Sequence, residues 1–128
     1  MTTRGIRGAI TIESDIQENV LSATHELLTA IVSSNPGLKT DSIGSAFFTV
    51  TDDIASMYPA LAARQMGWDQ VPMMCAREIP VTGGLSLCIR VLILWNTDTS
   101  QKEIRHVYLR DAARLRPDLI NQPKEKSK

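Results

Sequence analysis

One arginine interrupts the most apolar run of the sequence. Residues 88–95 read Cys-Ile-Arg-Val-Leu-Ile-Leu-Trp, and Arg90 is the only charged residue among them. A guanidinium in apolar surroundings is strongly disfavoured unless it has a partner. We therefore expect Arg90 to meet a carboxylate such as that of Glu78, a subunit interface or an anionic ligand. The pattern by itself leaves these alternatives open.

Two further arginines lie near the N-terminus, in the sequence Arg4-Gly5-Ile6-Arg7-Gly8-Ala9. The glycines allow another backbone or a ligand to come close to these side chains. Two Arg-Gly pairs without interleaved aromatic residues are too few to indicate RNA binding. The pattern fits either an anion site or plain surface positions.

Glu78 ends a predicted strand that also contains Met74 and Cys75. Because side chains alternate along a strand, Cys75 and Arg77 should project to one side and Met74 and Glu78 to the other. A glutamate at a strand end is often only solvated. An ion pair with an arginine is the structural alternative to a ligand contact.

The sequence offers little for covalent, metal or phosphate chemistry. Cys75 would need a nearby base to act as a nucleophile, and neither His25 nor His106 has a spacing that requires this role. Cys75 and Cys88 form no metal-ligand pattern. Gly83-Gly84 is not followed by a helix or by Lys-Ser or Lys-Thr, so it is not a phosphate loop. We therefore expect neither a metal nor a cofactor.

The composition indicates one small domain. The chain has 128 residues, of which 43% are hydrophobic and 22% charged, and its net charge is zero. Zero net charge removes the simplest electrostatic argument for a nucleic-acid or membrane partner. Two cysteines, no apolar signal stretch and no membrane-length apolar run predict a cytoplasmic protein with free thiols. We expect a single domain over residues 1–120 and a flexible polar tail over 121–128.

Apolar periodicity and capping signals predict the elements that position these residues. The predicted strands cover 2–12, 46–50, 71–78, 85–95 and 106–109, with a long amphipathic helix over 16–35 and a short helix over 60–66. Ser14 or Asp15 should cap the long helix, and Asp52 and Asp53 the turn after the second strand. Ser100 and Glu103 have the spacing of a capping box.

The order β-α-β-α-β-β-β predicts an α+β domain with a mixed five-stranded sheet. One long helix can cover only part of such a sheet. The opposite face would stay apolar and exposed. We therefore expect a homo-oligomer that buries this face between identical subunits.

Four segments together resemble the AroH type of chorismate mutase, a family of small monofunctional trimeric enzymes. They are residues 4–9, residues 81–85 with 88–91, residues 104–109 (Ile-Arg-His-Val-Tyr-Leu) and residues 115–119 (Leu-Arg-Pro-Asp-Leu). Each motif alone is modest, but their order and spacing are specific and extend over nearly the whole chain. The resemblance implies a homotrimer around a barrel-like core, with active sites in clefts between neighbouring subunits. It also implies isomerisation of chorismate to prephenate, on the route to phenylalanine and tyrosine, without a cofactor.

The resemblance further implies roles for individual residues. Arg90 would contact the ether oxygen and a carboxylate of the substrate, and Arg7 would bind a substrate carboxylate. Glu78 and the backbone or thiol of Cys75 would meet the ring hydroxyl. The other expected site residues are Tyr108 at the enolpyruvyl side chain, Met74 on the site strand, Tyr58 and Arg64 from the neighbouring subunit, and Leu115 with Arg116 in the C-terminal segment that closes over the site.

Two positions depart from the usual residues of this family. Many members have a lysine where Leu61 stands and a phenylalanine where Tyr58 stands. Loss of the lysine removes one peripheral positive charge, which affects substrate steering more than the chemistry.

Two other kinds of protein could use the same arginines. One is a non-catalytic trimer that senses a small carboxylate metabolite, and the other is an enzyme that acts on enamines or imines in a similar trimeric fold. The four matching segments argue against the second of these.

Overall fold

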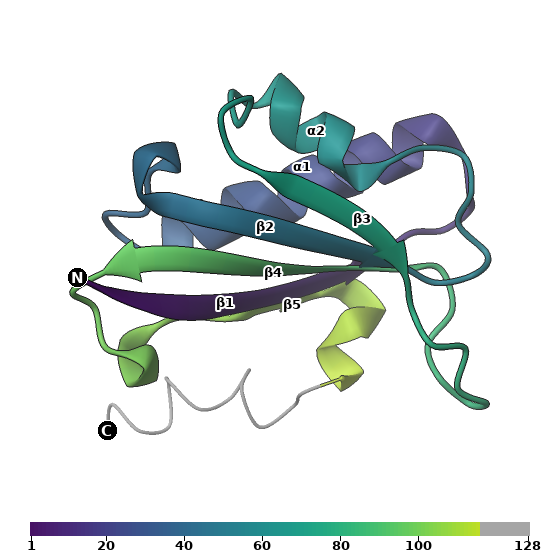
Figure 1. Cartoon of the computed structure of the whole chain (residues 1–128). Coiled ribbons are helices and arrows are strands. Elements are labelled where there is room, and N and C mark those ends of the chain that lie inside the picture. Colours follow the sequence, from purple (N-terminus) through teal and green to yellow (C-terminus); the bar gives the residue numbers. More distant parts are fainter. Residues whose placement is uncertain (116–128) are drawn as a thin grey trace.

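A five-stranded mixed sheet forms the centre of the structure, a computed structural model that describes residues 1–115 (Figure 1). The strands are β1 (Thr2–Thr11), β2 (Ile43–Val50), β3 (Met73–Arg77), β4 (Cys88–Thr97) and β5 (Val107–Leu109), in the sheet order β3-β2-β4-β1-β5. β4 runs antiparallel to β2 and β1, and the outer strands β3 and β5 run parallel to their neighbours. The predicted α+β fold with a mixed five-stranded sheet is confirmed. Arg116 and the predicted tail at 121–128 lie outside the described residues.

Two helices, α1 (Gln17–Ser34) and α2 (Pro59–Gln65), pack on one face of the sheet (Figure 1). The buried residues of α1 recur at helical spacing, at positions 20, 23, 24, 27, 28 and 31, so a single stripe faces the core. Pro59 occupies the first turn of α2, where its missing N–H is harmless. Within residues 1–115, no helix combines the length and hydropathy needed to cross a bilayer.

Three short 3₁₀ helices complete the described chain: η1 (Thr40–Ser42), η2 (Gln101–Glu103) and η3 (Arg110–Arg114). Ser100 and Glu103 form the predicted capping box at the start of η2. η3 follows β5 directly. Its Ala112 is fully buried in a small cluster with Ala9 and Cys88.

The strands present alternate side chains to the helices and to the opposite side, called here the open face. In β4, Ile89 and Ile93 are fully buried in the core beneath the helices, whereas Leu92 is 39% exposed on the open face. Phe47 of β2 pairs with Leu92 in register and is 38% exposed, and its β3 neighbour Met74 is 65% exposed. The helices thus leave an apolar stripe uncovered, as the sequence predicts.

The end of β3 and the start of β4 are shorter than predicted, because residues 78–87 form a loop between them. The predicted strand at 85–95 begins instead at Cys88, since Leu87 has a left-handed φ of 50° that an extended strand cannot contain. β3 begins at Met73 rather than at 71 and ends at Arg77 rather than at Glu78. The predicted turn lies within this loop, with Gly83 at a φ of 84°.

Two aspartates have partners that their local sequence does not indicate. Asp15 does not cap α1, whose N-cap residue is Ile16 without a side-chain hydrogen bond. Its carboxylate instead accepts hydrogen bonds from the backbone N–H groups of Ala55 (2.8 Å) and Ser56 (3.1 Å). The sequence predicts that Asp52 and Asp53 cap the next turn, but the carboxylate of Asp53 accepts the backbone N–H of Leu87, at the end of the loop at 78–87. Both capping predictions are wrong, because long-range backbone donors compete for these side chains.

Two glycines of β1 give a matched test of packing between the sheet and α1. A Cβ atom at Gly8 would lie 2.7 Å from Ile31 Cδ1 and 3.3 Å from the backbone oxygen of Val107, whereas one at Gly5 would lie 3.6 Å from Leu92 Cδ1. We expect Gly8→Ala to lower the free energy of unfolding by about 1–3 kcal/mol through overpacking. Gly5→Ala should stay within about 0.5 kcal/mol of the unmodified chain. Urea unfolding followed by circular dichroism measures both, and equal losses would contradict this account of the β1–α1 contact.

Candidate active site

Arg90 lies in the middle strand of the sheet and projects from the open face. It pairs in register with Thr49 of β2 and Ala9 of β1. Its side chain is 45% exposed. Although the neighbours of Arg90 in the sequence are apolar, its side chain is therefore not enclosed in an apolar environment. Alternation in β4 buries the flanking residues Ile89 and Val91 and leaves the guanidinium accessible to solvent and ligands.

The guanidinium of Arg90 has a carboxylate partner, one of the alternatives that the sequence leaves open. Nε of Arg90 lies 3.4 Å from Oε2 of Glu78, and the hydroxyl of Thr49 donates a hydrogen bond to the same oxygen. The backbone N–H of Glu78 donates to the Val50 oxygen at 2.9 Å, which fixes where the glutamate leaves β3. A partly exposed ion pair of this kind contributes about 1 kcal/mol or less to stability.

The ion pair leaves Arg90 able to bind a ligand. Glu78 engages Nε, so the two terminal nitrogens, which form the fork that fits a carboxylate, are not taken up by this salt bridge. Pairing with Glu78 and contact with an anion, which the sequence leaves as alternatives, are therefore compatible. The glutamate also restricts the orientation of the guanidinium plane.

A cleft of about 670 Å³ opens beside Arg90 on the open face, and we call it the Arg90 cleft. Five residues expected in the site line it together: Arg7 from β1, Glu78 after β3, Arg90 from β4, Tyr108 from β5 and Leu115 after η3. Its volume suits a small metabolite. Segments far apart in the sequence thus meet around one hollow.

The lining of the Arg90 cleft suits a small anion with an apolar body. Arg7 is exposed, and no ion-pair partner for its guanidinium exists within residues 1–115. Two guanidinium groups therefore face one carboxylate. Phe47 and Leu92 supply an apolar wall. The backbone N–H of Arg7 donates to Nδ1 of His106 at 2.9 Å, which ties β1 to the residue before β5.

A second hollow of about 390 Å³, called here the Tyr58 pocket, lies between β3 and the start of α2. Tyr58, Cys75 and Arg77 contribute to its lining. Cys75 pairs in register with Phe48, which faces the core, whereas Glu78 meets Arg90 on the open face. Cys75 and Glu78 therefore lie on opposite sides of the sheet, as alternation predicts. Nη1 of Arg77 donates to the backbone oxygens of Thr51 (3.0 Å) and Ile54 (2.8 Å). In a single chain, Cys75 and Glu78 face different hollows.

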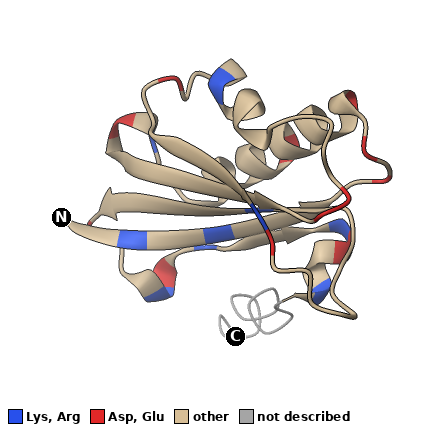
Figure 2. Ribbon diagram, turned by 45° about the vertical axis from the view of Figure 1, so that its right-hand side comes forward, with Lys and Arg blue, Asp and Glu red and all other residues tan. Residues whose placement is uncertain are grey.

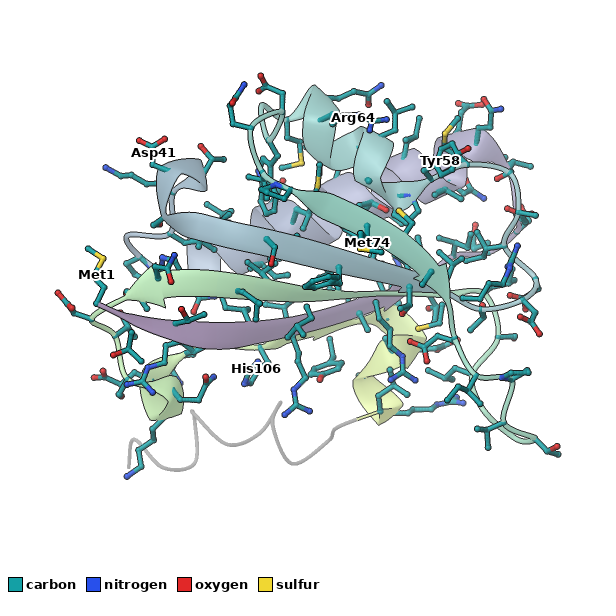
Figure 3. All side chains as sticks on the ribbon, viewed as in Figure 1. Met1, Asp41, Tyr58, Arg64, Met74 and His106 are labelled. Carbon is teal, nitrogen blue, oxygen red and sulfur yellow. The ribbon has the colours of Figure 1, made fainter. Side chains whose placement is uncertain are left out.

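The remaining expected site residues lie on β3, at α2 or outside the described chain. Tyr58 is 67% exposed at the start of α2, and Arg64 is exposed six residues further along the same helix (Figure 3). Met74 is 65% exposed on β3 (Figure 3). Arg116 lies outside residues 1–115. The structure therefore divides the expected residues into one group in the Arg90 cleft and another along β3 and α2.

Five residues that line the Arg90 cleft were not among the expected site residues: Gly8, Phe47, Thr49, Val91 and Leu92. Phe47 and Thr49 line it from β2, and Thr49 holds the Glu78 carboxylate. Strand alternation could have identified Phe47 and Thr49. If Ala46 and Phe48 of the predicted strand at 46–50 face the core, as they do, then Phe47 and Thr49 must face the other side of the sheet.

The charged residues of the described chain do not gather into a metal-ligating group. No cluster of three or more His, Cys, Asp or Glu side chains that could hold a metal ion occurs in residues 1–115. Charge instead changes sign over short distances, as where basic Arg77 precedes acidic Glu78 at the end of β3 (Figure 2). Burial raises the pKa of the Cys88 thiol to about 11, against the opposing effect of nearby Arg90. This thiol is therefore protonated near neutral pH and unsuited to nucleophilic or metal chemistry.

The fold and the cleft define a small α+β protein with an arginine-lined hollow on the open face of a mixed sheet. The family described as Chorismate mutase type I matches residues 3–119. The chain is 54% identical to chorismate mutase AroH of Thermus thermophilus over 116 residues, 91% of this chain and 95% of that protein. It is 44% identical to chorismate mutase AroH of Bacillus subtilis over 120 residues, 93% of this chain and 94% of that protein.

A solved structure agrees with these relatives. The chorismate mutase from Clostridium thermocellum superposes with a TM-score of 0.82 at 44% sequence identity, covering 84% of this chain and 96% of that one. The chain belongs to the chorismate mutase type I family. The resemblance that the four sequence segments indicate is thereby confirmed.

The buried thiol gives a prediction that needs no substrate. In a Cys75→Ser variant, Cys88 should resist iodoacetamide at pH 8, because a pKa of about 11 leaves about one thiol in a thousand ionised and the side chain is buried. Its labelling rate should rise with pH towards 11. Intact-mass spectrometry follows the adduct, and labelling in urea serves as the control. Native labelling at the rate of a free thiol would contradict the placement of Cys88.

Proposed function

We propose that the chain isomerises chorismate to prephenate in the Arg90 cleft, at an interface between copies of the chain. The activity is that of the family, an isomerase of phenylalanine and tyrosine biosynthesis. The observation that carries the assignment to this cleft is the meeting of Arg7, Glu78 and Arg90 around one hollow. We place the protein in the cytoplasm, where its two free cysteines would stay reduced.

The reaction requires the protein only to hold the substrate in one conformer and to stabilise developing charge. A C–O bond breaks while a C–C bond forms within one molecule, and neither a proton transfer nor a nucleophile is required. The protein must hold a flexible dianion in its compact reactive conformer. It must also stabilise the negative charge that grows on the ether oxygen as the C–O bond lengthens.

Arg90 suits the second task. It extends from the central strand of the sheet, and its guanidinium is held by Glu78, which is held in turn by Thr49. A cation fixed in advance needs little reorganisation when charge develops, so it favours the transition state over the ground state. The free fork of the same guanidinium can also contact a substrate carboxylate.

The other cleft residues suit the first task. Arg7 would bind a carboxylate at the rim, and Glu78 would accept a hydrogen bond from the ring hydroxyl. Tyr108 pairs in register with Ala9, beside Arg90, where it would hold the enolpyruvyl side chain. Leu115 would cover the apolar part of the substrate, and Arg116 would close the site from the C-terminal segment.

A neighbouring subunit would complete the site with Tyr58, Arg64, Met74 and Cys75. Three observations support this arrangement: these residues lie outside the Arg90 cleft of their own chain, they are exposed, and the open face carries an uncovered apolar stripe of Met74, Phe47 and Leu92. We propose a homotrimer around a barrel-like core. In a closed ring, one surface of each copy meets a different surface of the next, so each interface would hold one complete site.

Replacement of Arg90 tests the chemistry. We expect Arg90→Ala to lower kcat/KM by more than about a thousandfold, because it removes both the charge at the ether oxygen and a carboxylate contact. Arg90→Lys should remain poor, since lysine lacks the planar fork. The loss of chorismate absorbance in the ultraviolet measures the rate.

Arg105→Ala is the matched control, because Arg105 is exposed and lies outside the Arg90 cleft. It should turn over chorismate at the rate of the unmodified chain. Near-normal turnover by Arg90→Ala would disprove the assigned role. Binding of chorismate without turnover by the unmodified protein would indicate a sensor.

Mixed assemblies test the shared site. Arg7→Ala and Arg64→Ala should each be nearly inactive, because each removes a guanidinium from a different half of the site. If random trimers form after the two variants are unfolded and refolded together, about a quarter of the sites combine two intact halves. We therefore expect about a quarter of the unmodified activity, with a trimer mass by light scattering. A mixture no more active than its components would rule out a site shared between subunits.

A further inference from the structure

Two side chains after β2 hold the start of β4, and we call them the Thr51–Asp53 clamp. Both carboxylate oxygens of Asp53 accept the backbone N–H of Leu87, each at 3.0 Å. The hydroxyl of Thr51 donates to Asp53 Oδ1 at 2.5 Å and accepts the backbone N–H of Cys88 at 3.0 Å. The backbone N–H of Thr51 donates to the Cys88 oxygen at 3.1 Å.

The clamp holds a conformation that leucine disfavours. Leu87 has a φ of 50°, a left-handed value that is rare and strained for bulky residues. Its backbone oxygen accepts the N–H of Ile12 at 2.9 Å, so Leu87 is held from two directions. Without the Asp53 carboxylate, the Leu87 N–H loses its acceptor, and the backbone can relax towards an extended form.

Such a relaxation would change the position of Arg90 relative to Glu78, the two residues of the proposed catalytic pair. The loop at 78–87 begins with Glu78 and ends three residues before Arg90. Its first residue is tied to Thr49 and Val50, and its last residue to Asp53. Residues 49–53 therefore fix both ends of the loop that separates the two partners. A shift of about 1 Å in such a pair can lower a rate about a hundredfold.

We propose that Asp53 is a positioning residue for catalysis, acting through Leu87 to set the place of Arg90 relative to Glu78. Asp53 does not line the Arg90 cleft, so it would not touch the substrate there. The proposal rests on the proposed function of that cleft. It goes further by assigning part of the site's geometry to a carboxylate outside it.

A neighbouring aspartate provides the matched control. Asp52 is exposed, has no hydrogen bond or ion pair within residues 1–115, and lines the same hollow of about 430 Å³ as Asp53 and Arg90. Asp52→Ala therefore removes the same charge at a similar place without releasing Leu87. We expect Asp53→Ala to lower kcat about 10- to 100-fold with a smaller change in KM. Asp52→Ala should keep kcat within about twofold.

Two further variants separate positioning from general stability. Asp53→Asn keeps one oxygen for the Leu87 N–H and should retain kcat within about fivefold. Adding Leu87→Asn to Asp53→Ala should recover at least about fivefold in kcat, because asparagine adopts left-handed φ more readily. The double variant should not regain Tm, since it loses the packing of Leu87 against the core. If kcat follows Tm across the series, Asp53 is merely structural and the proposal is wrong.

Amide hydrogen exchange tests the clamp independently of turnover. The backbone N–H groups of Leu87 and Cys88 should exchange at least about tenfold faster in Asp53→Ala than in Asp52→Ala. This measurement also applies to Asp53→Asn if the alanine variant does not fold. Unmodified protein that fails to turn over chorismate would refute the proposed function, while unchanged exchange at Leu87 would refute the clamp. Faster exchange with kcat equal to that of Asp52→Ala would keep the clamp and refute its catalytic role.

Discussion

The register of β4 between β2 and β1 is the constraint on which the rest of the structure depends. Helices cover one face of the sheet, so every second residue of β4 enters the core and the others reach the open face. A shift of one residue would bury Arg90 and expose Ile89 and Val91. The core therefore fixes the position of the guanidinium, although the guanidinium contributes little to the core.

The Arg90–Glu78 pair illustrates how an ion pair can organise a site without stabilising a fold. The Arg90 side chain is 45% exposed and the Glu78 side chain 23% exposed, so solvent still reaches the pair and weakens the attraction. The same exposure leaves the guanidinium accessible to an anion. The Thr49 hydroxyl and the Val50 oxygen, both on β2, hold Glu78 in place. The neighbouring strand β2 therefore helps to set the orientation of Arg90 on β4.

Local patterns predicted much of the fold, because they report on local chemistry. The order of elements, the alternation along β3 and the capping box at Ser100 all depend on residues close in sequence or on strand period. The failures involve partners distant in sequence. Asp15 and Asp53 bind backbone groups some 40 and 34 positions away, and no local pattern identifies such donors. The distant contact with Asp53 accompanies the left-handed φ of Leu87. For this reason β4 begins at Cys88, and the predicted start at residue 85 was wrong.

The alternation of β3 also bears on assembly. Cys75 and Glu78 stand three positions apart, with their side chains on opposite sides of one strand. Within one chain, the two side chains therefore line different hollows. β3 is an outer strand, so its free edge and the Tyr58 pocket can approach the open face of another chain. On the proposed function, strand alternation thus has two effects: it places Arg90 in its cleft, and it turns Cys75 towards a separate hollow that the proposed neighbouring subunit would bring to the site.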